Sequence, residues 1–442
     1  MKKLYMKNLT GMQVFTLVWF GQFVSIMGTS ITKFALMIWA YEMVGKASTT
    51  ALLGFSSLLP YVILSPIAGV IIDRFDRKKI MILSDLMAGI VTATILILFI
   101  LGEIEVWHLF IAEAFMGASE AFQIPAYISS ITLLIPKAKY SRASGMRSFS
   151  SYSAQIFAPI ISGLLVVSIG ITGILLIDIV TFFLSMFALV MVNIPNPENK
   201  EDKSMNMRED LKFGINYLIK RRGLFLLMLI FLAINFLAAM TYFGILPAMI
   251  LARTDNNKMI LASVQAALGL GGVIGSLIVS FIGTPRKKVF TMLMAAALSY
   301  LLGDIFLGIG TTEFVWYVAA FLSSFVLPFI MSSQNALWQS KVDPSIQGRV
   351  FSIKGMLQLG SMPLGYIVGG LLADYVFEPA MRSGGNLERI FGWLVGSGNG
   401  SGMALMFAIN GVLGVIICVG GYFLKDVRFL EDNLPDYDMK SN

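Results

Sequence analysis

The feature that most constrains this chain of 442 residues is a series of long, almost uninterrupted apolar runs. Each run approaches or exceeds the roughly 20 residues that an α-helix needs to cross the hydrocarbon core of a bilayer. The runs are continuous and lack the alternation of transmembrane β-strands, which predicts helices. They lie near residues 12–40, 49–72, 80–101, 108–134, 144–168, 171–192, 224–252, 259–283, 289–309, 313–338, 351–376 and 402–424. The sequence therefore predicts an all-α membrane protein with twelve transmembrane helices.

A polar stretch divides these runs into two sets of six. We expect an N-terminal six-helix bundle over residues 1–192, a cytoplasmic linker over 193–222 and a C-terminal six-helix bundle over 223–442. Within the linker, apolar residues recur with a helical period over 206–220, which predicts an amphipathic helix on the inner membrane surface. Glycine, serine and asparagine are frequent near 376–402, which predicts a flexible hairpin on the outer side.

The positive charges indicate how the chain is oriented. Most of the 33 Lys and Arg residues lie at the termini, in the linker and in alternate connections between runs. Cytoplasmic loops of membrane proteins carry such an excess, so both termini are predicted to be cytoplasmic, in the cell membrane. The net charge of +7 is distributed over these connections and forms no patch, so it does not indicate nucleic-acid binding.

The sequence offers few groups for catalysis. A single cysteine, Cys418, permits no internal disulfide, and a single histidine, His108, excludes the common zinc motifs. No phosphate-binding loop of the G-x-x-x-x-G-K-[ST] type is present. We therefore expect no enzymatic activity, no cofactor and no metal, and an ion or solute gradient as the source of energy.

The two halves of the sequence resemble each other. The segment Arg142–Arg147 begins 21 residues before a Gly-Leu-Leu at Gly163, and Arg349–Lys354 begins 21 residues before another at Gly370. Many secondary transporters are built from a duplicated six-helix unit, with the substrate site between the halves near the bilayer midplane. The repeat therefore predicts two pseudo-symmetric six-helix bundles.

The connection between the second and third runs carries the most specific motif. It reads Gly69-Val-Ile-Ile-Asp73-Arg74-Phe-Asp-Arg77-Lys78-Lys79. This resembles the signature loop of the major facilitator superfamily, G-x-x-x-D-R-x-x-R-K/R. The resemblance implies a conformational switch in which Gly69 lets two helices approach closely and Asp73 pairs with a cation or caps a helix. Arg74, Arg77 and Lys78 would hold the loop at the cytoplasmic surface.

Other stretches resemble the macrolide-efflux branch of the drug and siderophore exporters in that superfamily. They are Trp19-Phe-Gly-Gln22, Leu59-Pro60, Asp85-Leu86, Pro125-Ala126, Gly348-Arg349-Val350-Phe351-Ser352, Pro363-Leu-Gly365 and Leu372-Ala-Asp374. The resemblance implies export of amphipathic small molecules by alternating access, usually in antiport with protons. The sequence also departs from the superfamily pattern, because Met116 stands near the position where many antiporters have an arginine.

Ionisable side chains inside the apolar runs are candidate sites, because a charge there is costly unless it faces protein or water. Glu120 lies near the middle of the fourth run, and Glu113 lies seven residues earlier on the same helix face. We predict that Glu120 couples protons or binds substrate, with Glu113 as a relay or as the partner of Lys33. Asp178 is a further coupling candidate, with a helix–helix hydrogen bond as the alternative. Lys33 is another, with snorkelling of its ammonium to the outer interface as the alternative. Asp304 ranks lower, because the ninth helix is usually peripheral in this family.

The substrate pocket is expected to be apolar, aromatic and adaptable, in keeping with 27 methionines. Its candidate residues are Trp19, Gln22, Met27, Gln155, Asn235, Tyr242, Gln265 and Gln334. The expected partners are a small molecule, protons and the lipid bilayer, with the protein as a monomer. A siderophore exporter or a solute importer of the same fold is an alternative. A lipid flippase or a transporter-like sensor is another, for which Lys33 would be the only intramembrane cation.

Overall fold

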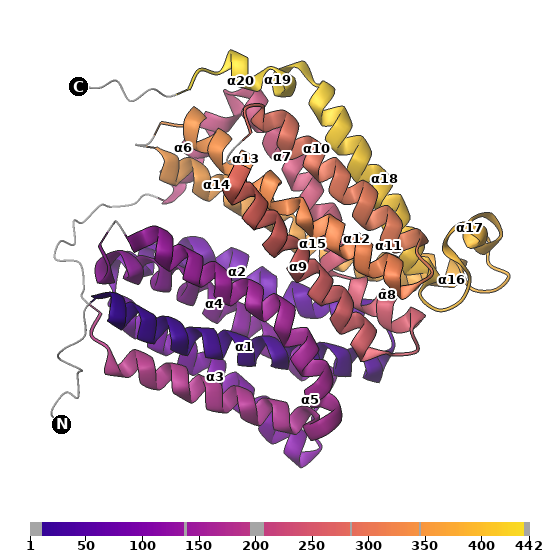
Figure 1. Cartoon of the computed structure of the whole chain (residues 1–442), viewed down its shortest axis with the longest axis horizontal. Coiled ribbons are helices and arrows are strands. Elements are labelled where there is room, and N and C mark those ends of the chain that lie inside the picture. Colours follow the sequence, from indigo (N-terminus) through magenta and orange to yellow (C-terminus); the bar gives the residue numbers. More distant parts are fainter. Residues whose placement is uncertain (1–10, 137–138, 195–206, 283–284, 344–345, 437–442) are drawn as a thin grey trace. The chain divides into compact units, whose positions relative to one another are not determined.

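The computed structural model describes residues 11–136, 139–194, 207–282, 285–343 and 346–436. These residues form helices and contain no strand (Figure 1). Ten of the described segments are long and apolar enough to cross a membrane. The chain divides into two compact units. The first is made of residues 1–45 and 52–202, and the second of residues 46–51 and 203–442.

The first unit contains long helices. They are α1 (Gly11–Val44), α2 (Ala47–Arg74), whose first turn groups with the second unit, α3 (Arg77–Leu101), α4 (Val106–Leu134) and α5 (Tyr140–Met191). Helix α5 is 52 residues long and changes direction at Gly170, where φ is 67° and ψ is −178°. Only glycine adopts such a backbone conformation readily. Counting α5 as two spans and adding α4 brings the ten candidate segments to the predicted twelve.

The second unit is built from shorter pieces. Its helices are α6 (Met207–Ile219), α7 (Arg222–Ala238), η2 (Ala239–Phe243), α8 (Leu246–Arg253), α9 (Lys258–Ile282), α10 (Lys288–Ser299), η3 (Tyr300–Ile305), α11 (Phe306–Ile309), α12 (Glu313–Phe325), α13 (Leu327–Lys341), α14 (Gln347–Gly360), α15 (Met362–Leu372), η4 (Ala373–Phe377), α16 (Glu378–Ala380), α17 (Glu388–Val395), α18 (Ser401–Phe423), α19 (Lys425–Arg428) and α20 (Leu430–Asn433). The three η elements are π-helices, and within the described residues all of them belong to this unit. Helix α18 runs beside α10 and α11 (Figure 1).

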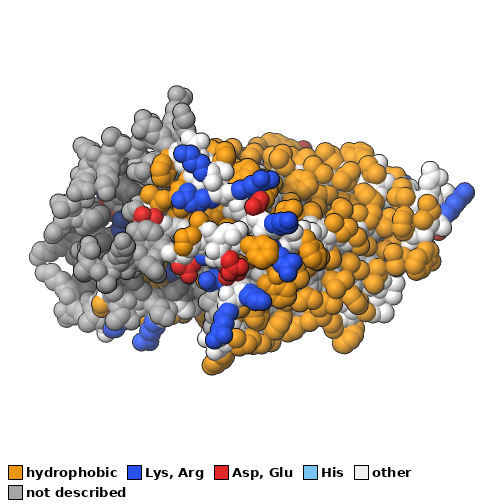
Figure 2. All heavy atoms as spheres, turned by 90° about the horizontal axis from the view of Figure 1, so that it is seen from above, with side chains coloured by type: hydrophobic (Ala, Val, Ile, Leu, Met, Phe, Trp, Pro, Cys, Tyr) orange, Lys and Arg blue, Asp and Glu red, His pale blue; other side chains and the backbone are white. Residues whose placement is uncertain are grey.

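Large hydrophobic side chains cover the outside of the helices. Phe183 in α5 is 63% exposed, Ile97 in α3 is 56% exposed and Ile416 in α18 is 60% exposed. Figure 2 shows hydrophobic side chains over most of the described surface on one face, with most of the charged side chains in one region. Soluble monomers rarely expose apolar patches of this extent. The surface is therefore suited to lipid tails.

Two predicted segments outside the spans have different outcomes. A helix is present as α6 where the amphipathic helix was expected over 206–220, and its place on the inner membrane surface stays a prediction. The flexible hairpin expected near 376–402 is wrong in part, because the stretch contains helix α17 and is tied to α18 by Glu378. The carboxylate of Glu378 accepts hydrogen bonds from the backbone N–H groups of Gly400 (3.1 Å) and Met403 (2.8 Å). The glycine content of the stretch concealed the short amphipathic pattern of α17.

Lys341, at the end of α13, fixes the chain that follows α18. Its buried ammonium donates to the carbonyl oxygens of Glu431 (2.8 Å) and Leu434 and pairs with the Asp436 carboxylate at 2.9 Å. The hydrogen bond from the Lys341 ammonium holds the pKa of the Asp436 carboxyl group below its usual range. Because the folded-state pKa is lowered, the pairing contributes stability above the ordinary titration range of a carboxyl group. That contribution is lost as the pH falls through the lowered pKa.

Candidate functional site

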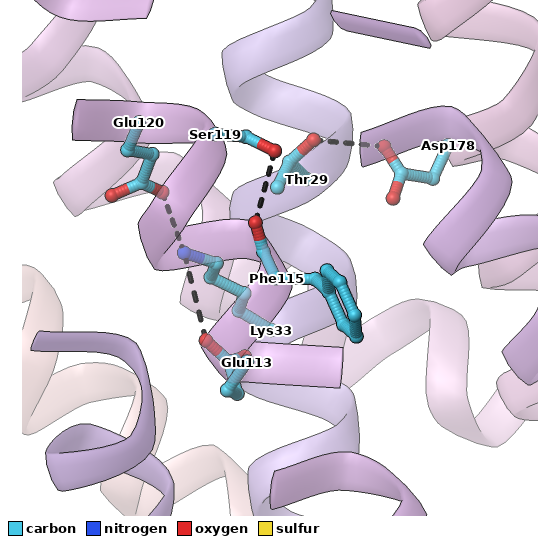
Figure 3. A network of polar contacts seen from close by, with 7 residues as sticks. All are labelled: Thr29, Lys33, Glu113, Phe115, Ser119, Glu120 and Asp178. Carbon is cyan, nitrogen blue, oxygen red and sulfur yellow. Dashed lines mark hydrogen bonds and ion pairs between the residues drawn. The ribbon is translucent and has the colours of Figure 1, made fainter. Parts of the chain in front are cut away.

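The first unit brings together one ammonium and two carboxylates, the Lys33 triad (Lys33, Glu113 and Glu120). The Lys33 Nζ of α1 lies 2.7 Å from Glu120 Oε1 and 3.8 Å from Glu113 Oε2, both on α4. Figure 3 shows the ammonium pointing between the two acids. The seven-residue spacing puts both acids on one face of α4. The predicted pairing of Lys33 with Glu113 is present, and the shorter contact is with Glu120.

The triad is only partly buried, and this exposure decides which of its groups a proton or a substrate can reach. The side chains of Lys33 and Glu120 are 32% and 44% exposed, whereas that of Glu113 is 17% exposed. One cation between two ionised carboxylates leaves a formal charge of −1, and a single proton makes the group neutral. Because Glu120 is the most open member, a proton or a cationic substrate can reach it without disrupting helix packing.

Asp178 lies close to the triad but has its own partners (Figure 3). The hydroxyl of Thr29 on α1 donates to Asp178 Oδ1 at 3.1 Å, and the hydroxyl of Thr92 on α3 donates to Oδ2 at 3.4 Å. Asp178 is 2% exposed, so both oxygens of a buried carboxyl are hydrogen-bonded. This is the helix–helix hydrogen bond that stood as the alternative to a coupling role.

A layer of amide side chains lies further toward the start of α1. The Gln22 amide donates to Asp85 Oδ2 and to Ser185 Oγ, each at 3.0 Å. The Gln123 amide of α4 donates to Asp85 Oδ1 at 2.8 Å. Gln22 was a pocket candidate, and the structure places it in this buried network. Gln123 was not predicted, although its position three residues after Glu120 on one helix face was a usable signal.

Side chains of the signature loop donate hydrogen bonds to backbone carbonyls in the C-terminal parts of α4 and α5. Arg77 donates to the Ser129 carbonyl at 2.9 Å, and the Lys78 ammonium donates to the carbonyls of Val190 and Val192. Cations suit the exposed carbonyls at helix C-termini. The cap of α3 is Asp76, whose carboxylate accepts from the backbone N–H of Lys78 at 2.9 Å. The side chains of Asp73 and Arg74 lie outside what the structure describes.

The close helix approach expected at Gly69 stays a prediction. Among the described residues, a Cβ added to Gly69 would meet no atom within 4 Å. A close approach does occur at Gly117 of α4, where an added Cβ would overlap the carbonyl oxygen of Ser57 on α2.

The other pocket candidates are divided between the units. Trp19 donates to the Met146 carbonyl at 2.8 Å and stacks on Phe23, and Asn235 donates to the Gln358 carbonyl at 3.3 Å. Gln155 is exposed on α5, and Met27 packs against the α1–α5 cluster that contains Ile31. Three candidates are half-buried in the second unit, namely Tyr242 on η2, Gln265 on α9 and Gln334 on α13.

Comparison with solved structures concerns the fold. The nucleoside transporter NupG matches with a TM-score of 0.64 and 12% identity, over 93% of this chain and all of that one. A bacterial homologue of the iron transporter ferroportin, in an inward-facing state, matches with a TM-score of 0.65 and 14% identity. That match covers 93% of this chain and 99% of the homologue.

Comparison of sequences gives the family. Macrolide efflux protein A of Streptococcus pyogenes is 26% identical over 367 residues, which cover 82% of this chain and 90% of that protein. The Staphyloferrin A transporter of Staphylococcus aureus is 22% identical over 80% of this chain and 88% of its own length. The family model described as Major Facilitator Superfamily matches residues 18–366. Because that match spans most of the sequence, this protein is a member of the major facilitator superfamily.

Proposed function

We propose that this protein exports amphipathic small molecules by alternating access, in antiport with protons, and that the Lys33 triad couples the two. It would lie in the cell membrane with both termini in the cytoplasm. The name of the macrolide-efflux relative supports export of such compounds. The observation that carries the coupling role is the single Lys33 ammonium between two carboxylates in a partly open site.

The chemistry of the triad suggests how coupling would work. With Glu120 ionised, Lys33 is shared between two carboxylates and the group keeps a negative charge. A proton on Glu120 removes that charge and leaves Lys33 to pair with Glu113. The two protonation states then differ in the cost of closing the site away from water, because a net charge in low dielectric is unfavourable. Alternating water access would load the proton on one side and release it on the other.

The test replaces Glu120 by glutamine in proteoliposomes that contain a labelled macrolide. If Glu120 carries the proton, Glu120→Gln abolishes accumulation driven by a pH gradient but retains exchange of substrate between the two faces. Glu103→Gln is the matched control, because Glu103 is an exposed acid in the same unit, between α3 and α4. Accumulation at the wild-type level in Glu120→Gln would remove the triad from the coupling mechanism.

An anionic substrate such as a siderophore is the second candidate. It is favoured by the 32% exposure of Lys33 and by the name of the staphyloferrin relative. In that case the substrate would pair with Lys33 in place of one carboxylate. Export of a labelled siderophore, with no competition by the macrolide, would favour this candidate over the first.

A further inference from the structure

The second unit buries a carboxyl group that the triad does not involve. Asp304 in η3 is 0% exposed and meets side chains from two other elements. Its Oδ1 accepts hydrogen bonds from the Thr241 hydroxyl of η2 at 3.1 Å and from the Asn410 amide of α18 at 3.3 Å. Together with Tyr242 of η2, these residues form what we call the Asp304 cluster.

Three oxygen atoms in this cluster have no hydrogen bond of good geometry within the described part of the chain. They are Asp304 Oδ2, Asn410 Oδ1 and the Tyr242 hydroxyl. The orientation of Asn410 is fixed, because its amide nitrogen also donates to the Leu237 carbonyl at 3.1 Å, which can only accept. The Tyr242 hydroxyl lies against Gly303, the residue next to Asp304, since an added Cβ there would overlap it. Unpaired oxygens therefore gather beside the acid.

The Asp304 carboxyl group has no positively charged partner among the described residues. Among the described residues, no Lys or Arg forms an ion pair with Asp304. The other titratable groups near it are the hydroxyls of Tyr242 and Tyr300, neither of which is a cation. A bare carboxylate in such a place costs several kcal/mol, and each unpaired buried oxygen adds to that cost.

The backbone is also unusual where the cluster forms. Thr241 and Tyr242 lie in one π-helix and Asp304 lies in another. Such segments are rare and are found frequently at functional sites. The irregular turns and the unpaired oxygens are separate observations that point to the same position.

We propose that the Asp304 cluster is a small-cation site, which holds a proton on Asp304 Oδ2 or a Na⁺ ion between the unpaired oxygens. A proton would turn Oδ2 into a donor for which Asn410 Oδ1 and the Tyr242 hydroxyl are acceptors. A Na⁺ ion would use the same three oxygens as ligands, which suit a hard cation. Either one neutralises the carboxylate without a protein cation.

The test measures thermal unfolding of the purified full-length protein, with choline chloride or NaCl, at several pH values. A proton bound only in the folded state makes stability fall as the pH rises, by about tenfold in the folded-to-unfolded ratio per pH unit. If Na⁺ binds, NaCl at about ten times its dissociation constant raises that ratio about tenfold. Asp304→Asn, which mimics the neutral acid, removes both responses. Glu313→Gln, an exposed acid of α12, retains them.

Infrared difference spectra keep the proposal testable if Asp304→Asn is not recovered. The wild-type protein should show the C=O band of a buried carboxylic acid, which disappears either at high pH or on addition of Na⁺. Tyr242→Phe keeps the ring and removes one unpaired oxygen, so it should shift that band or weaken the Na⁺ response. Unchanged responses in Asp304→Asn, or an unchanged spectrum in Tyr242→Phe, would overturn the proposal. Because no readout uses transport, its failure is distinct from failure of the proposed function.

Discussion

Each unit of this protein buries one carboxyl group among its first, third and sixth predicted spans, and the two groups are satisfied differently. In the first unit Asp178, on the sixth span, accepts one hydrogen bond on each oxygen, from Thr29 and Thr92. In the second unit the acid is on the third span as Asp304, with Thr241 on the first span and Asn410 on the sixth. The threonine of the first span occurs in both, whereas the acid has changed helices and one of its oxygens is unpaired.

The surroundings of the two acids differ as well. The first unit places the Lys33 triad one helical turn from Thr29 and, within the described residues, contains no π-helix. The second unit interrupts three spans with π-helices and, within the described residues, has no comparable triad. The comparison teaches that the two units of one fold can each bury an acid and satisfy its oxygens differently. Three sets of substitutions can break or sharpen that view.

The largest effect is expected from Lys33→Met. It leaves Glu113 and Glu120 without their cation, so both carboxylates are held neutral or repel each other, and proton-driven transport should fall at least about tenfold. Transport into proteoliposomes measures it. Lys139→Met, an exposed lysine before α5, is the control. Wild-type transport by Lys33→Met would mean that the Lys33 triad of the first unit does not couple protons to transport.

A smaller effect is expected when the two acid clusters lose a partner. Asn410→Leu removes a donor to Asp304 Oδ1 and leaves the Leu237 carbonyl without that bond, which should destabilise the protein by about 2 kcal/mol. Thr92→Val removes one bond of 3.4 Å from Asp178, which keeps Thr29, and should cost about 1 kcal/mol. Measurement of the unfolding free energy in detergent compares the two variants. Equal losses would contradict the view that the two acids are satisfied differently.

The smallest effect is expected at Gly69. An added methyl group meets nothing, so Gly69→Ala should change the unfolding free energy by less than about 1 kcal/mol, in the stabilising direction. Gly303→Ala is the counterpart in the second unit, where the methyl group would overlap Tyr242 and Ser323 and should cost about 1–3 kcal/mol. Thermal unfolding distinguishes them. A destabilised Gly69→Ala would show that the motif glycine packs closely after all.

The sequence predicted the features that depend on local pattern. Apolar runs predicted the helices, and the spacing of Glu113 and Glu120 predicted two acids on one face. It did not predict Thr29 or Thr92 as partners of Asp178, because hydroxyl groups are common in such helices and only the packing selects which ones face an acid. The π-helices η2 and η3 were also not predicted, since no residue pattern distinguishes them from α-helix. Asp304 was ranked low because the ninth helix is usually peripheral in this family.

The π-helices of the second unit have a consequence for helix rotation. An α-helix turns by about 100° per residue, and a π-turn holds roughly one residue more than an α-turn. The segments that follow η2 and η3, α8 and α11, are therefore offset in angle from the helices that precede them. Conversion of either π-turn to α-helix would turn the following segment by about 100° and separate the side chains that now meet at Asp304. The rotation of these helix segments and the contacts of the Asp304 cluster therefore change together.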